Sequence, residues 1–282
     1  MNVVESLKKA TEFLERRDVA SPRLNSELLL SCMLGISRVE LYTGFDRELT
    51  EEEAERFKEM LMKRAAGCPL QYLTGETGFF SATYVVCPGV FIPRPETEVL
   101  VEKALEMLPD RPVKVLDIGT GNGCIAISIA LERANAELLA TDISASALVL
   151  CNRNADRLGV SDRVGTALGD LYEPIGPSER FDMVISNPPY ICSTEAGELD
   201  VEVREFEPPQ ALFAGESGME VIRKLVSGAP GHLKPGGLFA IEIGETQGAR
   251  STALFEDAGF EEVELAKDLA GRDRVVTGKY LK

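Results

Sequence analysis

A carboxamide, two prolines and an aromatic ring follow one another at Asn187-Pro188-Pro189-Tyr190, directly after the apolar run 181–186. The run predicts a buried strand, which would hold these residues at its carboxyl end. Neither proline has an N–H group and both fix φ, so the turn is rigid and its prolines can only accept hydrogen bonds. The Asn187 side chain and a free carbonyl beside a flat ring suit a planar –NH2 group, either an amide or an exocyclic base amine. An ordinary proline-rich turn is the alternative interpretation.

A glycine-rich segment upstream, Asp117-Ile-Gly-Thr-Gly-Asn-Gly123, separates the apolar run 113–117 from an apolar-periodic stretch at 125–130. A strand, a glycine turn and a helix in this order form the first unit of a nucleotide-binding α/β sheet. The glycines let the backbone approach a ligand and open the helix at its electropositive end. The spacing is G-x-G-x-G rather than the dinucleotide G-x-G-x-x-G, and a glycine loop alone is a weak signal.

Two carboxylates follow the next two predicted strands. Asp142 closes the run 136–142, about 20 residues after the glycine loop, where an acidic group can bind a ribose diol. Asp170 comes just after the third run, 164–168. Either acid could instead cap a helix or a turn.

Taken together, these motifs and their order resemble the class I S-adenosylmethionine-dependent methyltransferases that act on amino groups. Two further segments are similar to the HemK/PrmC family, and the similarity covers essentially the whole chain. Members of that family are glutamine N5-methyltransferases that modify the Gly-Gly-Gln motif of peptide chain release factors. Asn122 departs from the Ser or Thr of many relatives. The two segments are Phe91-Ile-Pro-Arg-Pro-Glu-Thr-Glu98 and Glu207-Pro-Pro-Gln-Ala-Leu-Phe-Ala-Gly215.

The resemblance implies that S-adenosyl-L-methionine is the cofactor and that it leaves as S-adenosyl-L-homocysteine. It also assigns the cofactor residues: Asp142 would bind the ribose hydroxyls, and Asp170 with Leu171 would flank the adenine. The other cofactor residues that it implies are Asp117, Gly119, Thr120, Gly121, Asn122, Gly123 and Asn187.

For the transfer itself, we infer that the side-chain oxygen of Asn187 and the carbonyl of Pro188 accept the two protons of a target amide. Tyr190 would pack on the amide plane and exclude water. The methylated amide is strongly acidic, so its proton can leave after transfer without a dedicated base. For Arg94 and Glu96, mutual pairing is the alternative to substrate contact. The implied substrate-binding set is Asn187, Pro188, Pro189, Tyr190 and Arg94.

The chain divides into three predicted parts. Residues 1–75 show helical periodicity, with a capping box at Thr50-Glu-Glu-Glu53, and predict a small substrate-docking bundle. Residues 78–92 are β-rich and predict a hairpin within a linker at 76–93. Over 94–282, helix and strand patterns alternate, which indicates an α/β domain with a Rossmann-like, mostly parallel seven-stranded sheet. The predicted strands are 113–117, 136–142, 164–168, 181–186, 237–243, 262–265 and 274–280.

The charge distribution favours a protein substrate. The formal net charge is −16, and residues 1–75 contribute only −2 of it, from 11 basic and 13 acidic side chains. The stretch 191–216 carries seven acids against Arg204 alone. An acidic rim beside the site would repel phosphates, whereas nucleic-acid-binding proteins usually present a basic surface.

The sequence offers few residues for metal binding, disulfide formation or histidine-based catalysis. The six cysteines form no C-x-x-C pair, so neither a zinc site nor a disulfide scaffold is expected. The only histidine, His232, lies in a predicted helix-to-strand turn with no reactive neighbour. No apolar run has the roughly 18 residues of a membrane span, and no signal-peptide pattern opens the chain, so we expect a cytoplasmic enzyme.

Three rival functions stay open. A nucleic-acid methyltransferase acting on adenine N6 or guanine N2 could use the same turn on a flipped base. A glutamine methyltransferase of a ribosomal protein would need the same chemistry. A nucleotide-binding adaptor without activity would have little reason to keep both Asp142 and Asn187.

Overall fold

The computed structural model describes residues 1–44 and 46–282. These residues form two compact units. The first comprises Met1–Glu76 with Asp200–Phe206, and the second comprises Thr77–Leu199 with Glu207–Lys282. Among the residues described, no helix is both long enough and apolar enough to span a membrane.

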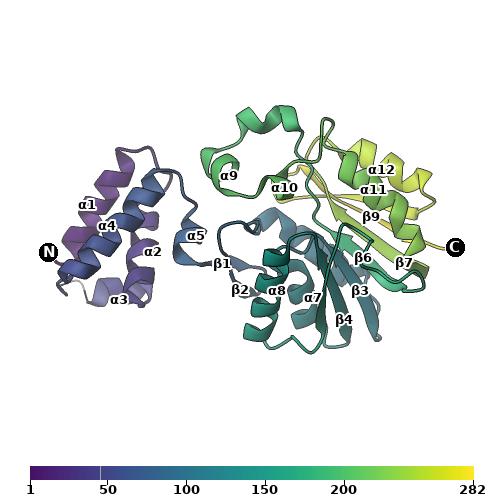
Figure 1. The fold of residues 1–282 in the computed structure, drawn as a ribbon, viewed down its shortest axis with the longest axis horizontal. Helices are drawn as coiled ribbons and strands as arrows, with labels where there is room; N and C mark the ends of the chain where they lie inside the picture. The colour runs from purple at the N-terminus through teal and green to yellow at the C-terminus, as the bar shows by residue number, and fades with distance from the viewer. Residues whose placement is uncertain (45) are drawn as a thin grey trace. The chain divides into compact units, whose positions relative to one another are not determined.

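The first unit is helical (Figure 1). Leu14, Leu29 and Leu30 are fully buried at its centre. The predicted capping box is present, because the Thr50 hydroxyl accepts the Glu53 N–H and the Glu53 carboxylate accepts the Thr50 N–H. Two such boxes at other helix starts further satisfy free N–H groups. The helices are α1 (Val3–Glu15), α2 (Pro22–Leu34), α3 (Arg38–Thr43), α4 (Glu51–Ala65), α5 (Leu70–Thr74) and α9 (Val201–Phe206).

The second unit is built on a seven-stranded sheet with the order β5-β4-β3-β6-β7-β9-β8. The first five strands are parallel, and the last two run antiparallel to their neighbours. This confirms the expected α/β fold with a mostly parallel sheet. The strands are β3 (Val113–Ile118), β4 (Ala136–Asp142), β5 (Val164–Leu168), β6 (Phe181–Ser186), β7 (Leu233–Glu242), β8 (Glu261–Lys267) and β9 (Asp273–Tyr280).

Helices cover both faces of the sheet (Figure 1). Alternate residues of β3 enter different cores: Val115 packs with α6, α7 and α8, whereas Leu116 packs with α11 and α12. Burial on both faces explains why this strand reads as a continuous apolar run. The helices of this unit are η1 (Pro95–Thr97), α6 (Glu98–Met107), α7 (Cys124–Glu132), α8 (Ala145–Arg157), η2 (Ser193–Glu198), α10 (Pro209–Leu212), α11 (Glu220–Gly228), η3 (Ala229–Gly231) and α12 (Gly248–Asp257).

Two predicted elements differ from the structure by more than two residues at one end. β7 begins at Leu233 rather than at residue 237, because Leu233 pairs with Phe181 before a bulge that shifts the register to Met183 opposite Leu238. The hairpin consists of β1 (Glu76–Phe79) and β2 (Ala82–Val85), so strand structure stops well before residue 92. Pro88 and Pro93 lie in the remaining stretch, and neither can donate to a strand ladder.

Candidate functional site

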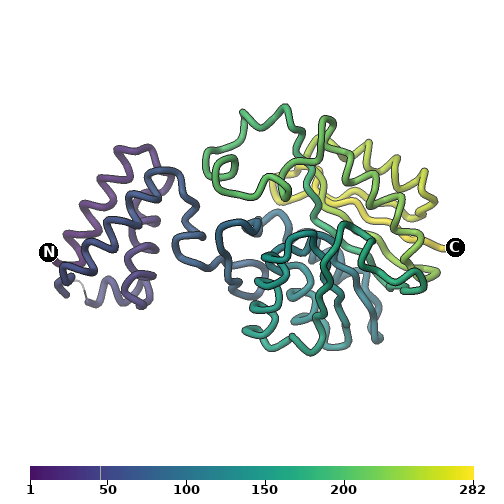
Figure 2. Tube along the Cα trace, in the orientation of Figure 1, coloured from purple at the N-terminus to yellow at the C-terminus, as the bar shows by residue number. Residues whose placement is uncertain are grey.

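The predicted site residues meet where the strand order reverses. After β3 the chain adds β4 and β5 on one side, then returns to place β6 on the other side of β3, as Figure 2 traces. The carboxyl ends of β3 and β6 therefore lie side by side, with Ile118 paired to Ser186. A crevice at such a switch point is the usual ligand position in open α/β sheets.

The glycine loop after β3 uses a backbone conformation that other residues rarely adopt. Gly119, Gly121 and Gly123 have φ of 73°, 57° and 86°. A Cβ on Gly123 would lie 2.6 Å from Cys151 Sγ, so that glycine allows α7 and α8 to pack closely. A Cβ on Gly119 or Gly121 would meet no atom within 4 Å. These two glycines therefore leave open space above the loop.

Four of the five N–H groups from Gly119 to Gly123 are already used within the chain. Those of Gly119 and Thr120 bond to the carbonyl of Thr141 at 2.8 and 2.9 Å. The N–H of Gly121 donates to Asp142 Oδ2 at 2.9 Å, and that of Gly123 to the Thr120 carbonyl at 2.9 Å. Dinucleotide-binding loops instead keep free N–H groups for a pyrophosphate. This loop does not offer that kind of anion site.

Two carboxyl groups, the buried Asp117 and the half-buried Asp142, make the loop suitable for a cation. Asp117 is fully buried, and Thr120 donates to its Oδ2 at 2.6 Å. Its Oδ1 is buried without a hydrogen-bond partner among the residues that the structure describes. Burial, with a smaller contribution from the charge of Asp142, raises the pKa of Asp117 to about 7. A positively charged ligand would favour the ionised form of this carboxyl.

Asp142 is held between the loop and the start of α8. Its Oδ2 accepts the Gly121 N–H and its Oδ1 accepts the Ser144 N–H, each at 2.9 Å. Burial raises its pKa despite these bonds. Ser144, not Asp142, is the N-cap of α8, since its hydroxyl accepts the Ala147 N–H. The carboxylate oxygens retain lone pairs that can accept from ligand hydroxyls.

The other predicted cofactor residues differ in their accessibility. Asn122 is buried and turned inward: its Oδ1 accepts the Cys124 N–H at 3.2 Å, and its Nδ2 donates to the Val85 carbonyl at 3.4 Å. Asp170 is exposed beyond the end of β5. Leu171 is half-buried with a φ of 48°, a strained conformation for a side chain of this kind.

The Asn187 carboxamide is fixed by the segment before α6. Its Nδ2 donates to Thr97 Oγ1 at 3.0 Å, so its Oδ1 points away from that contact. Within the described residues, neither this oxygen nor the Pro188 carbonyl accepts a hydrogen bond. The turn after β6 thus presents the two free acceptors that the sequence predicted.

The backbone of the turn is held from its other side by Gln247. Its Nε2 donates to the carbonyls of Tyr190 and Gly218 at 2.9 and 3.1 Å, and its Oε1 accepts the Gly244 N–H at 2.9 Å. A Cβ on Gly218 would lie 2.5 Å from the Tyr190 carbonyl oxygen. The turn is therefore both bonded and closely packed.

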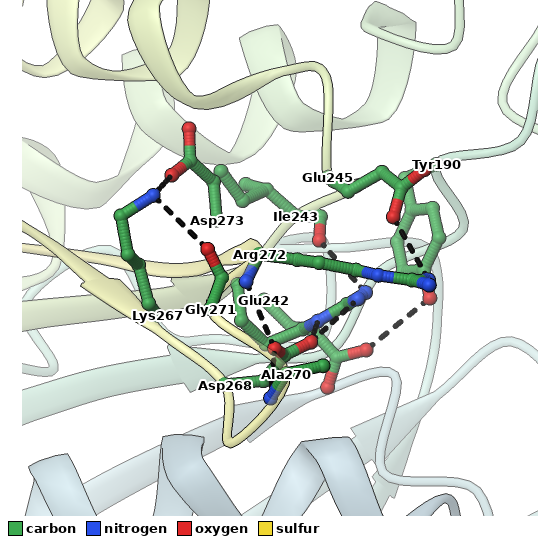
Figure 3. Close-up of polar contacts among 11 residues, drawn as sticks. Tyr190, Glu242, Ile243, Glu245, Lys267, Asp268, Ala270, Gly271, Arg272 and Asp273 are labelled. Atoms are coloured by element: carbon green, nitrogen blue, oxygen red, sulfur yellow. Dashed lines mark hydrogen bonds and ion pairs between the residues drawn. The ribbon is translucent and has the colours of Figure 1, made fainter.

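Glu242, at the end of β7, is a site residue that the sequence analysis missed. Only 1% of it is exposed, and its Oε1 accepts the Tyr190 hydroxyl at 3.3 Å (Figure 3). Burial raises the pKa of Glu242 to about 7, although hydrogen bonding from Thr97 and Tyr190 and the charge of Arg274 lower it. An acid within the apolar run 238–243 was the signal that could have revealed it.

Arg94 pairs with Glu207, so its pairing with Glu96, which was the alternative to substrate contact, is not what the structure shows. Glu207 is buried, and its second oxygen accepts the Ile92 N–H at 3.3 Å. This ion pair joins the two segments that carried the family resemblance. It also removes Glu207 from the expected acidic rim, while the acids at 200–206 belong to the helical unit.

His232 is remote from these groups. It precedes the first residue of β7, whereas Glu242 is the last, and its ring stacks on Tyr172 with centroids 4.8 Å apart.

Solved structures with the same fold are methyltransferases. One from Pyrococcus furiosus has a TM-score of 0.53 at 18% identity, covering 80% of this chain and 98% of that chain. A 16S rRNA methyltransferase of T. thermophilus, solved with AdoMet and guanosine, has a TM-score of 0.53 at 21% identity and covers 73% of this chain and 49% of that one. The sheet unit therefore has the fold of the class I methyltransferases.

Sequence comparisons identify the particular family. Residues 5–75 match the model of the PrmC N-terminal domain, and residues 87–205 match the methyltransferase small domain. The chain is 41% identical to the release factor glutamine methyltransferase of Koribacter versatilis, over 99% of both chains. For that of Geobacter sulfurreducens the identity is 42%, over 95% of this chain and 93% of the relative. The chain belongs to the release factor glutamine methyltransferase family.

Proposed function

We propose that this enzyme transfers a methyl group from S-adenosyl-L-methionine to the side-chain nitrogen N5 of the glutamine in the Gly-Gly-Gln motif of peptide chain release factors. Its full-length relatives carry that activity in their names. The observation that carries the chemical part of the proposal is the pair of free acceptors on Asn187 and Pro188 beside the glycine loop. This activity belongs in the cytoplasm, where release factors act.

S-adenosyl-L-methionine would supply an electrophilic methyl group on a positively charged sulfonium. The residues around the glycine loop fit such a ligand, because Asp117 is a buried acid, Asp142 is a half-buried acid, and four of the five loop N–H groups are already bonded within the chain. Gly119 and Gly121 leave room for the methionine part, Asp142 accepts from the ribose hydroxyls, and Asp170 with Leu171 flanks the adenine.

The protein's task in the reaction is to orient a weak nucleophile. An amide nitrogen delocalises its lone pair into the carbonyl, so it must be held with the lone pair aimed at the methyl carbon. Asn187 Oδ1 and the Pro188 carbonyl accept hydrogen bonds from its two N–H groups. These hydrogen bonds strengthen as the nitrogen becomes positive in the transition state. The Tyr190 ring covers the amide plane and excludes water. The proton leaves afterwards from the acidic methylated amide.

The decisive experiment is a labelling assay with the full-length enzyme. A release factor and S-adenosyl-L-methionine with a labelled methyl group are incubated with the enzyme, and mass spectrometry locates the added methyl. We expect it on the side-chain nitrogen of the Gly-Gly-Gln glutamine, and a release factor with Gln replaced by Asn should stay unlabelled. Label in ribosomal RNA, DNA or a ribosomal protein, with an unmodified release factor, would support the rival functions instead.

A further inference from the structure

Resting on this proposed function, we propose that Glu242 and Thr97 are positioning residues that set which end of the Asn187 carboxamide faces the substrate. A carboxamide has an oxygen end and an –NH2 end of nearly the same shape. Only the oxygen end can accept a hydrogen bond from the N–H of a substrate amide. A group that selects one orientation therefore decides whether the site can work.

Thr97 is the residue in contact with that carboxamide. It lies in η1, is 1% exposed, and its Oγ1 is 3.0 Å from Asn187 Nδ2. A hydroxyl has one proton to donate and two lone pairs with which to accept. Without further contacts, the Thr97 hydroxyl could accept a hydrogen bond from the –NH2 end of Asn187 or donate one to the oxygen end. The Asn187 orientation thus depends on where the Thr97 proton is directed.

Glu242 determines that direction. An ionised carboxylate can only accept hydrogen bonds. Its Oε1 already receives the Tyr190 hydroxyl, while its Oε2 is buried with no hydrogen bond from the described residues. Thr97 is the neighbouring hydroxyl whose influence lowers the pKa of Glu242, so we assign its proton to Oε2. Once Thr97 donates to Glu242, its oxygen can only accept from Asn187. The –NH2 end of Asn187 must then face Thr97, and Oδ1 must face the substrate.

The groups around Glu242 make this arrangement sensitive to pH. They are Tyr190 from the turn after β6, Arg274 from β9, and Thr97 with Glu96 from η1. With burial, they leave Glu242 with a pKa of about 7. When protonated, Glu242 can donate to Thr97, which then donates to Asn187 and turns its –NH2 end outward. The working orientation is therefore lost as the pH falls through about 7.

Three full-length variants test the inference: Glu242→Gln, Thr97→Val and Thr97→Ser. In Glu242→Gln the Tyr190 hydroxyl keeps the amide oxygen, so the new –NH2 group faces Thr97 and reverses the relay. Both Glu242→Gln and Thr97→Val should lower kcat at least about tenfold, since losing one directed hydrogen bond has that order of effect. Their affinity for S-adenosyl-L-methionine should stay within about twofold of wild type, since the glycine loop and Asp142 are left unchanged. Thr97→Ser keeps the hydroxyl and should retain most of kcat.

The pH profile provides a readout that a merely structural role would not change. Wild-type kcat should fall below about pH 7, and this acidic limb should be absent from the residual activity of Glu242→Gln and Thr97→Val. Thr277→Val is the matched control, because Thr277 is a threonine of β9 that is 2% exposed and lies outside this relay. It should keep both kcat and the acidic limb.

The inference and the proposed function fail in different ways. If wild type labels the release factor but Glu242→Gln keeps wild-type kcat, or all variants share one acidic limb, the relay is wrong and the activity stands. If wild type labels another macromolecule, the proposed function is wrong, and the same variants assayed on that substrate still decide the relay.

Discussion

At the scale of single residues, Asp142 has two tasks that one substitution would remove together. Its two oxygens accept hydrogen bonds from the N–H groups of Gly121 and Ser144, and it is the residue proposed to bind the ribose. Charge-assisted hydrogen bonds of this type contribute roughly 1.5–3 kcal/mol each. Asp142→Ala should therefore weaken binding of S-adenosyl-L-methionine at least about tenfold in a calorimetric titration. Thermal melting without ligand provides the control for folding, and equal affinity of both proteins, or displacement by NAD, would contradict the assignment.

Asn187 should affect turnover far more than cofactor binding. Removing its oxygen deletes one acceptor for the target amide and leaves the glycine loop and Asp142 intact. By analogy with the loss of one oxyanion-hole donor, Asn187→Ala should lower kcat about 100-fold or more. Single-turnover methylation of the release factor measures this loss, and a titration measures cofactor affinity. Normal turnover in Asn187→Ala would rule out the acceptor model.

The ionised form of Glu242 supports activity, and the same form should lower the free energy of unfolding. Its pKa is raised from 4.5 to about 7 in the folded protein, so between these values the folded state binds a proton that the unfolded chain releases. The free energy of unfolding therefore falls as pH rises from about 4.5 to 7. Glu242→Gln removes this dependence and should be more stable than wild type at pH 8, by up to about 3 kcal/mol. Denaturant unfolding at about pH 5 and 8 measures the difference, and parallel pH dependence in both proteins would contradict it.

At the scale of elements, apolar runs were enough to predict the strands. β4, β5 and β6 have the predicted bounds, because strands buried on both faces leave a continuous apolar signal. The start of β7 was missed because Gly236 and Gly237 interrupt the run, and only pairing with β6 shows that Leu233 belongs to the strand. Such a bulge depends on the neighbouring strand, which no local pattern describes.

The acceptor turn could be predicted from the sequence, but its supports could not. Asn187-Pro188-Pro189-Tyr190 is contiguous, so its chemistry can be read directly. Thr97 lies 90 positions before the turn, and Glu242 and Gln247 lie more than 50 positions after it, so their roles follow only from their contacts with the turn. Arg94 shows the same limit, since its partner Glu207 lies more than a hundred positions along the chain.

The packing behind the turn should matter as much as its hydrogen bonds. Gly218 has a φ of 70°, and a Cβ there would lie 2.5 Å from the Tyr190 carbonyl oxygen. Gly218→Ala should displace the turn and lower kcat at least about tenfold, because a misplacement of about 1 Å can reduce a rate 100-fold. Gly236→Ala is the matched control: its φ is 77°, but no atom lies within 4 Å of the new Cβ. Both variants carry the same backbone strain, so equal kcat values would show that the packing has no role.

At the scale of the whole molecule, the chain combines a catalytic sheet unit with a helical unit in which residues 1–75 carry a net charge of only −2. The helical unit has a pocket of about 450 Å³ that Leu24 and Tyr42 line together with Arg23, Glu27 and Arg38. Leu24, Val39 and Tyr42 are 40%, 71% and 47% exposed. We propose that this surface, defined by these three residues, docks a part of the release factor outside the Gly-Gly-Gln loop. Docking there would raise the effective concentration of the loop at the active site.

This docking predicts a difference between substrates. Val39→Asp should lower kcat/KM for the intact release factor about tenfold, since a buried apolar contact of this size contributes roughly 1.5–3 kcal/mol. A free Gly-Gly-Gln peptide cannot reach the docking surface, so it should be a poorer substrate and should respond equally to wild type and variant. Val149→Asp is the matched control, because Val149 is 70% exposed on α8 of the sheet unit. If Val39→Asp and Val149→Asp behave alike on the intact factor, the helical unit has another role, and recognition rests on the loop alone.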